Sequence, residues 1–437
     1  MEQQSSAVAS VPKQEEDIRA RWAWVEPSVW TESMLAALEN GVKGGKWYSL
    51  CDKVWNPANL QAAWERVYAN RGGSGVDGQS VHEYRTRDQQ ELIWLQDLLQ
   101  RDRYVPQPVL RRWIPKPGGR EKRPLGIPAV RDRVVQTALR HVMEPIFERI
   151  FAEHSYGFRP GRGCKDALRR VLSLLKRGHV WVVDADVKNY FDTIPHDRLM
   201  ALVEEHIADR RVLSLIRGYL KQGILDGMKE WTPESGTPQG AVISPLLANL
   251  YLNPLDHLMA GAGYEMVRYA DDFVILCRSR EEAKAALALV QNWMAGAGLT
   301  LHPEKTRIVN QADGFDFLGY HFEDDRHWPR RKSLTKFRDS IRILTRRANG
   351  HSLSEIIAQL NPKLRGWYGY FKHSYRATFP YLDGWIRRRL RTILNKRKRR
   401  SRWASTRGDH MSWPNAFFHA HGLFSLTAAH AAECQSL

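Results

Sequence analysis

The stretch Tyr269-Ala270-Asp271-Asp272 sets two adjacent carboxylates between two apolar runs, 265–268 and 273–276. Both runs are typical of β-strands, so the pattern predicts a hairpin with the two acids at its tip. Neighbouring side chains of a regular strand point to opposite faces, and the two acids can therefore serve one site only where the chain turns. Carboxylates held close together raise each other's pKa, and a hard divalent cation such as Mg²⁺ relieves the repulsion. Taken alone, the dipeptide also fits a solvated turn.

A second acidic segment follows the apolar run 180–183. Asp184 and Asp186 lie two residues apart and share one face of the predicted strand. Carboxylates at the end of a buried strand cost free energy unless they bind a partner. Two acid-bearing segments are what a two-metal phosphoryl-transfer site needs, because its ligands clamp ions roughly 4 Å apart. Together the two segments favour a metal site over a solvated turn.

The charge of the chain points to a polyanionic partner. Lys and Arg outnumber Asp and Glu by 66 to 48 among 437 residues, which gives a formal net charge of +18. Residues 326–402 hold 23 basic side chains against three acidic ones, a larger excess than that of the whole chain. Nucleic acid and an anionic membrane surface both suit such a charge. The longest apolar stretch, 241–252, is interrupted and too short to span a bilayer, which disfavours the membrane.

The start of the chain and its cysteines carry little functional signal. Residues 1–17 are polar and acidic, unlike a signal peptide, so a cytoplasmic protein is expected. The four cysteines are far apart and form no Cys-x-x-Cys pair, which argues against a zinc site or a disulfide framework. Residues 1–58 have no strong period and are predicted to form a loosely packed N-terminal extension.

Three loops are candidates for contact with a ligand. Residues 111–128 predict two short strands joined by a Gly-Gly turn, with cations at the tip that suit triphosphate oxygens or else only solvent. The basic loop 155–163 is a second candidate contact for backbone phosphates. In the third loop, a glycine on each side of Gln239 predicts close approach of the backbone to a ligand.

From Ser333 onward the sequence is helical and basic. Ser352 and Glu355 form a capping box that opens one helix, and Pro362 is placed in the first turn of the next. A last long helix is expected over 380–400. Its unpaired cations would repel one another, so phosphates are the expected partner and a solvated face is the alternative. The cations singled out for RNA binding are Arg387, Arg388, Arg389 and Arg391.

Four blocks, in this order, resemble those of the reverse transcriptases encoded by bacterial group II introns. They are Ala-Asp-Val-Lys-Asn-Tyr-Phe-Asp at 185–192, Thr-Pro-Gln-Gly-Ala at 237–241, Tyr-Ala-Asp-Asp at 269–272 and Phe-Leu-Gly-Tyr at 317–320. The resemblance runs from roughly Asn59 to the C-terminus. It implies an α+β fold of the right-hand polymerase type, with fingers, a palm built on an antiparallel sheet, and a helical thumb.

The resemblance also implies how the chain is divided. The expected parts are the extension 1–58, fingers and palm over 59–325, a basic thumb or maturase region over 326–400, and a short segment, 401–437, that is a candidate for DNA binding. Many relatives carry an HNH endonuclease after the thumb. It is expected to be absent here, because only Cys434 remains of the possible zinc ligands.

The resemblance assigns roles to single residues. Metal binding falls to Asp186, Asp271, Asp272 and the backbone carbonyl of Val187, with Asp184 as a neighbour and rival ligand. An aromatic ring at Phe191 would exclude a ribonucleotide 2′-hydroxyl, although plain core packing is the alternative. The implied nucleotide contacts are Lys116, Arg123, Val187, Phe191, Gln239 and Lys305, the last being a palm lysine near the primer end.

The implied activity is RNA-directed DNA synthesis with Mg²⁺ by a protein that also acts as a maturase, binding its intron RNA and assisting splicing. The implied partners are group II intron RNA, an RNA template, a DNA primer, a DNA target and dNTPs, and no membrane. One alternative is a host-adapted reverse transcriptase for defence or DNA repair. Another is an RNA-binding splicing factor without polymerase activity, against which the intact Asp186, Asp271 and Asp272 argue.

Overall fold

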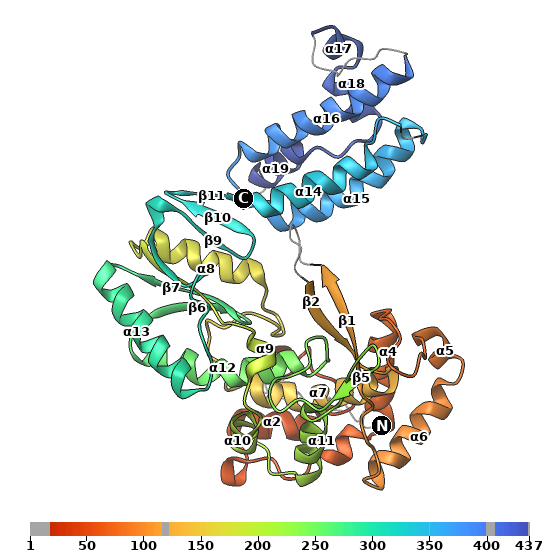
Figure 1. The fold of residues 1–437 in the computed structure, drawn as a ribbon, viewed down its shortest axis with the longest axis vertical. Coiled ribbons are helices and arrows are strands. Elements are labelled where there is room, and N and C mark those ends of the chain that lie inside the picture. The colour runs from red at the N-terminus through yellow and green to blue at the C-terminus, as the bar shows by residue number, and fades with distance from the viewer. Residues whose placement is uncertain (1–17, 116–121, 349, 399–406, 436–437) are drawn as a thin grey trace, which may run out of the picture. The chain divides into compact units, whose positions relative to one another are not determined.

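The computed structural model describes residues 18–115, 122–348, 350–398 and 407–435. The chain forms two compact units (Figure 1): the first runs to Gly178 and resumes over Val183–Arg307, and the second comprises His179–Val182 with Ile308–Leu437. Both units combine helices with small, mainly antiparallel sheets, which confirms the predicted α+β class. Over the described ranges, no helix has both the length and the apolar character needed to cross a membrane.

Helices make up most of the first unit. Its centre is α7, which is buried around nearly its whole circumference and packs on α4 through the apolar face Leu60, Ala63, Trp64 and Val67. The helices are α2 (Glu32–Asn40), η1 (Lys43–Gly45), α3 (Cys51–Val54), α4 (Pro57–Ala69), α5 (Val81–Arg85), α6 (Asp88–Gln100), α7 (Val130–Glu148), α8 (Cys164–Lys176), α9 (Tyr190–Thr193), α10 (His196–Glu204), α11 (Arg210–Leu220), α12 (Ser244–Gly261) and α13 (Arg280–Gly296).

The first sheet of this unit has the strand order β2-β1-β4-β5. Strands β1 (Val109–Pro115) and β2 (Lys122–Ile127) pair antiparallel from Leu110 opposite Ile127 to Pro115 opposite Lys122. The predicted hairpin over 111–128 is thus confirmed in its strands, and its tip, 116–121, lies outside the described residues. Strand β4 (Ile224–Asp226) joins β1 in parallel and turns back into β5 (Lys229–Trp231), an addition that the sequence did not predict.

The second sheet has the order β6-β7-β3-β8 and carries the acidic motifs. Strands β6 (Glu265–Tyr269) and β7 (Asp272–Cys277) form the predicted antiparallel hairpin, with Val267 opposite Val274. Helices α12 and α13 pack against them. Strand β3 (Trp181–Asp186) carries the other two acids, Asp184 and Asp186. The first two residues of β3 and all of β8 (Arg307–Asn310) except Arg307 belong to the second unit.

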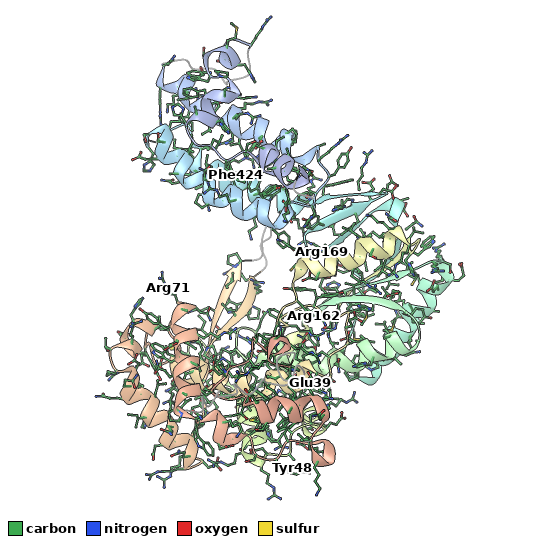
Figure 2. All side chains as sticks on the ribbon, turned by 180° about the vertical axis from the view of Figure 1, so that it is seen from behind. Glu39, Tyr48, Arg71, Arg162, Arg169 and Phe424 are labelled. Atoms are coloured by element: carbon green, nitrogen blue, oxygen red, sulfur yellow. The ribbon has the colours of Figure 1, made fainter. Side chains whose placement is uncertain are left out.

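From Trp22 onward the N-terminal residues contribute buried side chains to the fold, so the predicted loose packing is wrong for this part of the extension. Trp30 is buried and donates its indole N–H to the carbonyl oxygen of His141 at 2.9 Å. Trp22 donates to Glu39 of α2, labelled in Figure 2, at 2.7 Å. Asp209 accepts the backbone N–H groups of Leu50 and Cys51, both at 2.8 Å. Short helices held by indole rings leave no long period in the sequence, which is why the pattern indicated a loose segment.

The second unit combines a three-stranded sheet of order β11-β10-β9 with a helical bundle. The capping box is confirmed, since Ser352 and Glu355 bond each other's backbone N–H groups at the start of α15. Pro362 lies inside α15, so the predicted new helix at this point is wrong; Leu360 and Leu364 are buried on either side and hold the helix together. The elements are η2 (Gln311–Asp313), β9 (Phe315–Phe317), β10 (Tyr320–Glu323), β11 (Arg326–Pro329), α14 (Arg331–Leu344), α15 (Leu353–Phe371), α16 (Thr378–Arg397), α17 (Arg407–Ser412), α18 (Asn415–Ala420) and α19 (Leu426–Gln435).

The described tail, 407–435, belongs to the core of this bundle. Trp413, Phe418 and Leu426 are buried in the same apolar cluster as residues of α14, α15 and α16. Phe424, labelled in Figure 2, packs against that cluster. Asp383 of α16 is 4 % exposed and caps the start of α19 by accepting Leu426 N–H and Thr427 N–H, both at 3.1 Å. The tail therefore completes the helical unit and does not form a segment of its own.

Replacing Asp383 by Ala should lower the free energy of unfolding by about 2–3 kcal/mol, because it removes a helix cap and leaves buried N–H groups unpaired. The matched control is Asp339→Ala on α14, whose carboxylate is 56 % exposed and pairs with Arg342. That change should cost no more than about 0.5 kcal/mol. Urea unfolding followed by circular dichroism measures both, and equal stability of the two variants would contradict the capping role.

Candidate active site

Asp271 and Asp272 lie at the tip of the β6-β7 hairpin, as predicted. Tyr269 is the last residue of β6 and pairs with Asp272, so Ala270 and Asp271 form a two-residue turn. Ala270 has φ +59°, a left-handed conformation that an L-residue rarely adopts without support from its surroundings. The turn therefore needs an anchor beyond the strand pairing.

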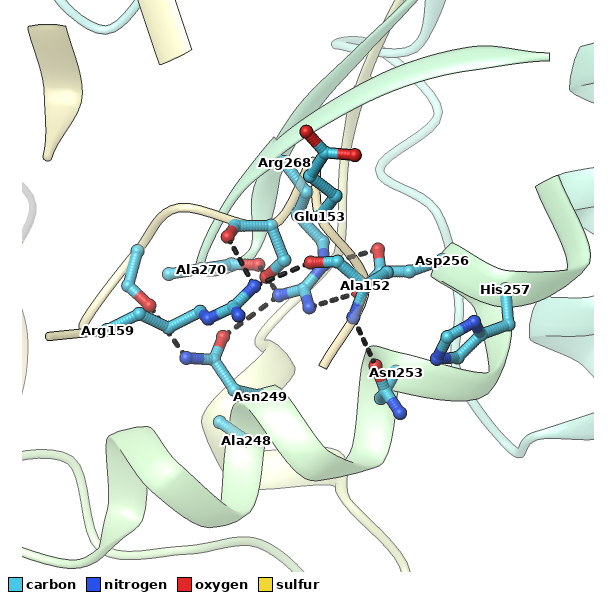
Figure 3. A network of polar contacts seen from close by, with 12 residues as sticks. Ala152, Glu153, Arg159, Ala248, Asn249, Asn253, Asp256, His257, Arg268 and Ala270 are labelled. Carbon is cyan, nitrogen blue, oxygen red and sulfur yellow. Dashed lines mark hydrogen bonds and ion pairs between the residues drawn. The ribbon is translucent and has the colours of Figure 1, made fainter. Parts of the chain in front are cut away.

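Arg268 supplies that anchor (Figure 3). Its side chain is fully buried and pairs through two nitrogens with the carboxylate of Asp256 on α12, Nε lying 2.7 Å from Oδ1. Its third nitrogen donates to Asn249 Oδ1 at 3.0 Å and to the carbonyl oxygen of Ala270 at 2.8 Å. One guanidinium thus ties the backbone of the acidic turn to two side chains of α12.

The loop before α8 supports the same turn from its other side. Tyr156 N–H donates to the carbonyl of Arg268 at 2.9 Å, and Asn249 donates to the carbonyl of Gly157 at 2.6 Å. Arg159 of this loop is buried, pairs with Glu148 at 2.7 Å and donates to the carbonyl of Ser155 at 2.8 Å. The hypothesis that this basic loop contacts phosphate is therefore wrong for Arg159, whose charge is used inside the protein.

Asp186 ends β3 and meets a cation from a separate segment. Lys305 Nζ lies 2.6 Å from Asp186 Oδ2, and the lysine side chain is 60 % exposed. The backbone is held by bonds from His302 N–H to the Asp186 carbonyl at 2.7 Å and from Lys188 N–H to the Thr300 carbonyl at 2.8 Å. These two bonds do not use the carbonyl of Val187, the backbone group that was predicted to bind metal.

The carboxylates of the two acidic segments lie close enough to interact electrostatically. Burial raises the pKa of the Asp271 carboxyl above its usual value, and the charge of Asp186 raises it further. Its own backbone N–H, Arg268 and Lys305 oppose that rise. A buried carboxylate whose ionisation is disfavoured by a neighbouring one, with oxygen as the donor atom on both, is a donor set that suits a hard divalent cation. Among the described residues no three His, Cys, Asp or Glu side chains already form a metal cluster, and Asp186 is neutralised by Lys305.

Asp184, the rival ligand, has a different cation. Arg307 Nε lies 3.2 Å from Asp184 Oδ2, and the Asp184 side chain is 18 % exposed. The two acids on one face of β3 are thus matched to two cations, Arg307 for the first and Lys305 for the second.

The loop that carries Gln239 braces three parts of the first unit. Thr237 N–H donates to the carbonyl of Phe191 at 2.6 Å, and Gly126 N–H of β2 donates to the carbonyl of Gln239 at 2.6 Å. Gly240 has φ +113°, and a Cβ there would lie 2.4 Å from the carbonyl oxygen of Gly126. A Cβ at Gly236 would likewise lie 2.6 Å from the carbonyl oxygen of Phe191. The glycines flanking Gln239 thus allow backbone to approach backbone here, in place of the predicted approach of backbone to a ligand.

Phe191 and Gln239 line one cavity of about 690 Å³, but the structure does not place every predicted nucleotide contact there. Arg123 is exposed and is absent from the described lining, although its neighbour Pro124 is present. Arg123 pairs with Ile114 and Pro124 pairs with Trp113, so the two pairs face opposite sides of the β1-β2 ladder. Lys116 lies outside the described residues.

The four arginines of α16 that were predicted to bind RNA have different environments. Arg391 is 1 % exposed and donates to the carbonyl of Trp413 at 2.8 Å, so the prediction is wrong for this residue. Arg389 donates to Thr345 Oγ1 at 2.6 Å, and Arg387 lies 3.9 Å from Asp383. Arg388 is exposed. The sequence showed the charges but not the acceptors that bind them, which include the carbonyl of Trp413 in the tail and Thr345, the residue that follows α14.

Two family models match the chain in the order of its motifs. The model described as "Reverse transcriptase (RNA-dependent DNA polymerase)" matches residues 114–322, a range that contains Asp186, Asp271 and Asp272. The model described as "Group II intron, maturase-specific domain" matches residues 334–410, from α14 to α17.

Curated relatives point the same way. The chain is 33% identical over 342 residues to Protein YkfC of Escherichia coli (strain K12), covering 69% of this chain and 85% of that protein. It is 38% identical over 205 residues to Group II intron-encoded protein LtrA of Lactococcus lactis subsp. cremoris, covering 46% of this chain and 33% of that protein. A 91 kDa protein in the cob intron of Schizosaccharomyces pombe is 33% identical over 321 residues, with coverages of 60% and 39%. The match thus spans most of YkfC but about a third of LtrA.

Arg268→Met should destabilise the protein by about 3–5 kcal/mol, because Asp256 is then left as an unpaired buried charge. The double variant Arg268→Met with Asp256→Leu should recover most of that loss, since both buried charges are gone. Arg217→Met, which breaks the exposed pair with Glu204, is the control and should change stability by no more than about 0.5 kcal/mol. Chemical denaturation compares the variants, and a double variant no more stable than Arg268→Met would contradict this account.

Proposed function

As the chain belongs to the family of group II intron-encoded reverse transcriptases and maturases, we propose that it is an RNA-directed DNA polymerase that also binds a group II intron RNA as a maturase. The observation that carries this proposal is the coupling of Asp271, on one hairpin, to Asp186, at the end of another strand, with Lys305 beside them. Carboxylates brought together from separate segments are what nucleotidyl transfer requires.

Polymerases of this family depend on a divalent metal, and we infer that the ion is Mg²⁺ because every proposed donor is an oxygen. When bound, Mg²⁺ makes the primer 3′-hydroxyl more nucleophilic and offsets the charge that develops on the leaving pyrophosphate. Asp186, Asp271, Asp272 and the carbonyl of Val187 would hold it. Lys305, on a long and largely exposed side chain, then becomes available to pair with a phosphate near the primer end.

The remaining nucleotide contacts are proposed on both sides of the β1-β2 ladder. Phe191 is half-buried, and the Gln239 loop fixes its backbone, which suits a ring that limits the space beside the sugar of a dNTP. Arg123, exposed on the other face of β2, is a proposed contact of the triphosphate. Lys116 keeps the role implied by the resemblance.

The family implies nucleic-acid partners, and we propose group II intron RNA, an RNA template with its DNA primer, and a DNA target. On the second unit, Arg338 lies over the ring of Tyr381 at 5.3 Å, and Arg342 and Arg389 flank Trp385 at 5.9 and 5.4 Å. Apart from the N–H groups that Arg342 and Arg389 donate to Asp339 and Thr345, guanidinium groups stacked on rings present their N–H edges to phosphates. With the exposed Arg388, these groups make the face of α14 and α16 the proposed RNA contact.

Asp271→Ala combined with Asp272→Ala should lower primer extension on an RNA template by about a thousandfold or more, because metal stabilisation of the transition state contributes several kcal/mol. RNA affinity should persist, since the excess positive charge lies between Arg326 and Arg402. Asp184→Asn serves as the control and should keep most of the activity. Extension and RNA binding are measured on one preparation of each variant. Retained extension in the double variant would remove these acids from the catalytic centre.

Phe191→Val should lower the preference for dNTPs over rNTPs by about 10–100-fold, because a smaller side chain leaves room for a 2′-hydroxyl. Phe191→Tyr keeps the ring and should retain the selection. Single-nucleotide incorporation with matched dNTP and rNTP gives the ratio of kcat/KM values for each variant. A Val variant that selects as strongly as the parent would assign Phe191 to core packing.

A further inference from the structure

The cavity lined by Phe191 and Gln239 extends to two exposed tryptophans of the β2-β1-β4-β5 sheet. Trp113 of β1 is 47 % exposed and Trp231 of β5 is 38 % exposed, and both line the cavity. Arg111 lies between them, with its guanidinium carbon 4.7 Å from the Trp231 ring centroid and 5.7 Å from that of Trp113. Trp113 is fixed by a hydrogen bond from its indole N–H to Asp226 at 3.0 Å, whereas Trp231 lies on the edge strand of the sheet.

The chemistry of this wall suits a nucleobase better than a phosphate. Flat aromatic rings and a stacked guanidinium offer surfaces on which any base can stack. Asp192 and Glu234 line the same cavity, and their carboxylates repel a phosphate but accept hydrogen bonds from the exocyclic amino groups of bases. Arg111 is the one Lys or Arg among the described residues that line the cavity, and it is already stacked on the rings.

The same lining argues against the incoming nucleotide as the source of the base. Asp186, Asp271 and Asp272, near which its triphosphate must lie, are absent from the described lining. Arg123, the proposed triphosphate contact, faces the other side of the ladder. The cavity nevertheless reaches Phe191, where the new base pair would form. With the incoming nucleotide excluded, the base that can reach this cavity is that of the next template nucleotide, which is not yet paired.

We propose that this cavity binds the unpaired template nucleotide ahead of the new base pair, with its base stacked on Trp231. This inference rests on the proposed polymerase function. It gives the β4-β5 hairpin a role, because the hairpin extends the sheet and supplies Trp231.

The test compares two primer–template duplexes, one blunt and one with a short 5′ overhang of unpaired template, bound to the full chain without dNTP. The parent should bind the overhang duplex about tenfold more tightly than the blunt one, and Trp231→Ala should abolish that difference without changing affinity for the blunt duplex. Trp231→Phe should retain it. Trp94→Ala is the matched control, since Trp94 is 42 % exposed on α6 and has the Arg131 guanidinium 5.4 Å from its ring centroid.

Several results would overturn the proposal. They are a parent without overhang preference, an Ala variant that keeps it, equal weakening on both duplexes, or the same effect from Trp94→Ala. If the base came from the incoming nucleotide, Trp231→Ala would instead weaken only the tightening that a matched dNTP produces. Primer extension by the parent protein is measured in a separate assay, which tests the polymerase function independently of the overhang preference. Overhang preference in a protein that extends no primer would refute the polymerase function while leaving the binding site in place.

Discussion

The buried ion pair between Arg268 and Asp256 is the interaction on which the acidic turn depends. Removing two charges from water costs several kcal/mol for each, and close pairing with full hydrogen bonding is needed to repay it. The pair meets that condition, because the remaining guanidinium nitrogen also bonds Asn249 and the carbonyl of Ala270. An apolar pair could give equal stability but could not hold a backbone carbonyl at a fixed place. We therefore interpret the buried ion pair as a means of positioning Asp271 and Asp272, which the desolvation cost of the two charges accompanies.

Local patterns predicted the parts of the fold that depend on local chemistry. The strand–turn–strand pattern around Asp271 gave the hairpin, and Ser352 with Glu355 gave the start of α15. The sequence could not show that Arg268 pairs with Asp256, because the two residues come from a strand and a helix that meet only in the folded chain. The packing of the N-terminal tryptophans could not be predicted for the same reason, because Trp30 donates to the carbonyl of His141, which is distant in the sequence.

Net charge also proved to be an incomplete guide to the site. Many of the cations counted in the sequence neutralise carboxylates or bind carbonyls within the protein, including Arg159 with Glu148, Arg307 with Asp184 and Arg391 with the carbonyl of Trp413. The charge that remains for nucleic acid is that of exposed side chains such as Arg388. A residue-level prediction of RNA contacts thus needs burial, which a run of Arg and Lys letters does not contain.

The Gln239 loop connects the residue proposed for sugar selection to the sheet proposed for template binding. Its backbone bonds Phe191 and Gly126, so the proposed sugar-selecting ring and strand β2 are held at a fixed spacing. Gly240 makes this possible, since any side chain there would collide with the carbonyl of Gly126. β2 pairs with β1, and β1 carries Arg111 and Trp113 into the cavity. A shift of the loop would therefore move Phe191, the ring proposed to lie beside the incoming sugar, together with the surface proposed for the template base.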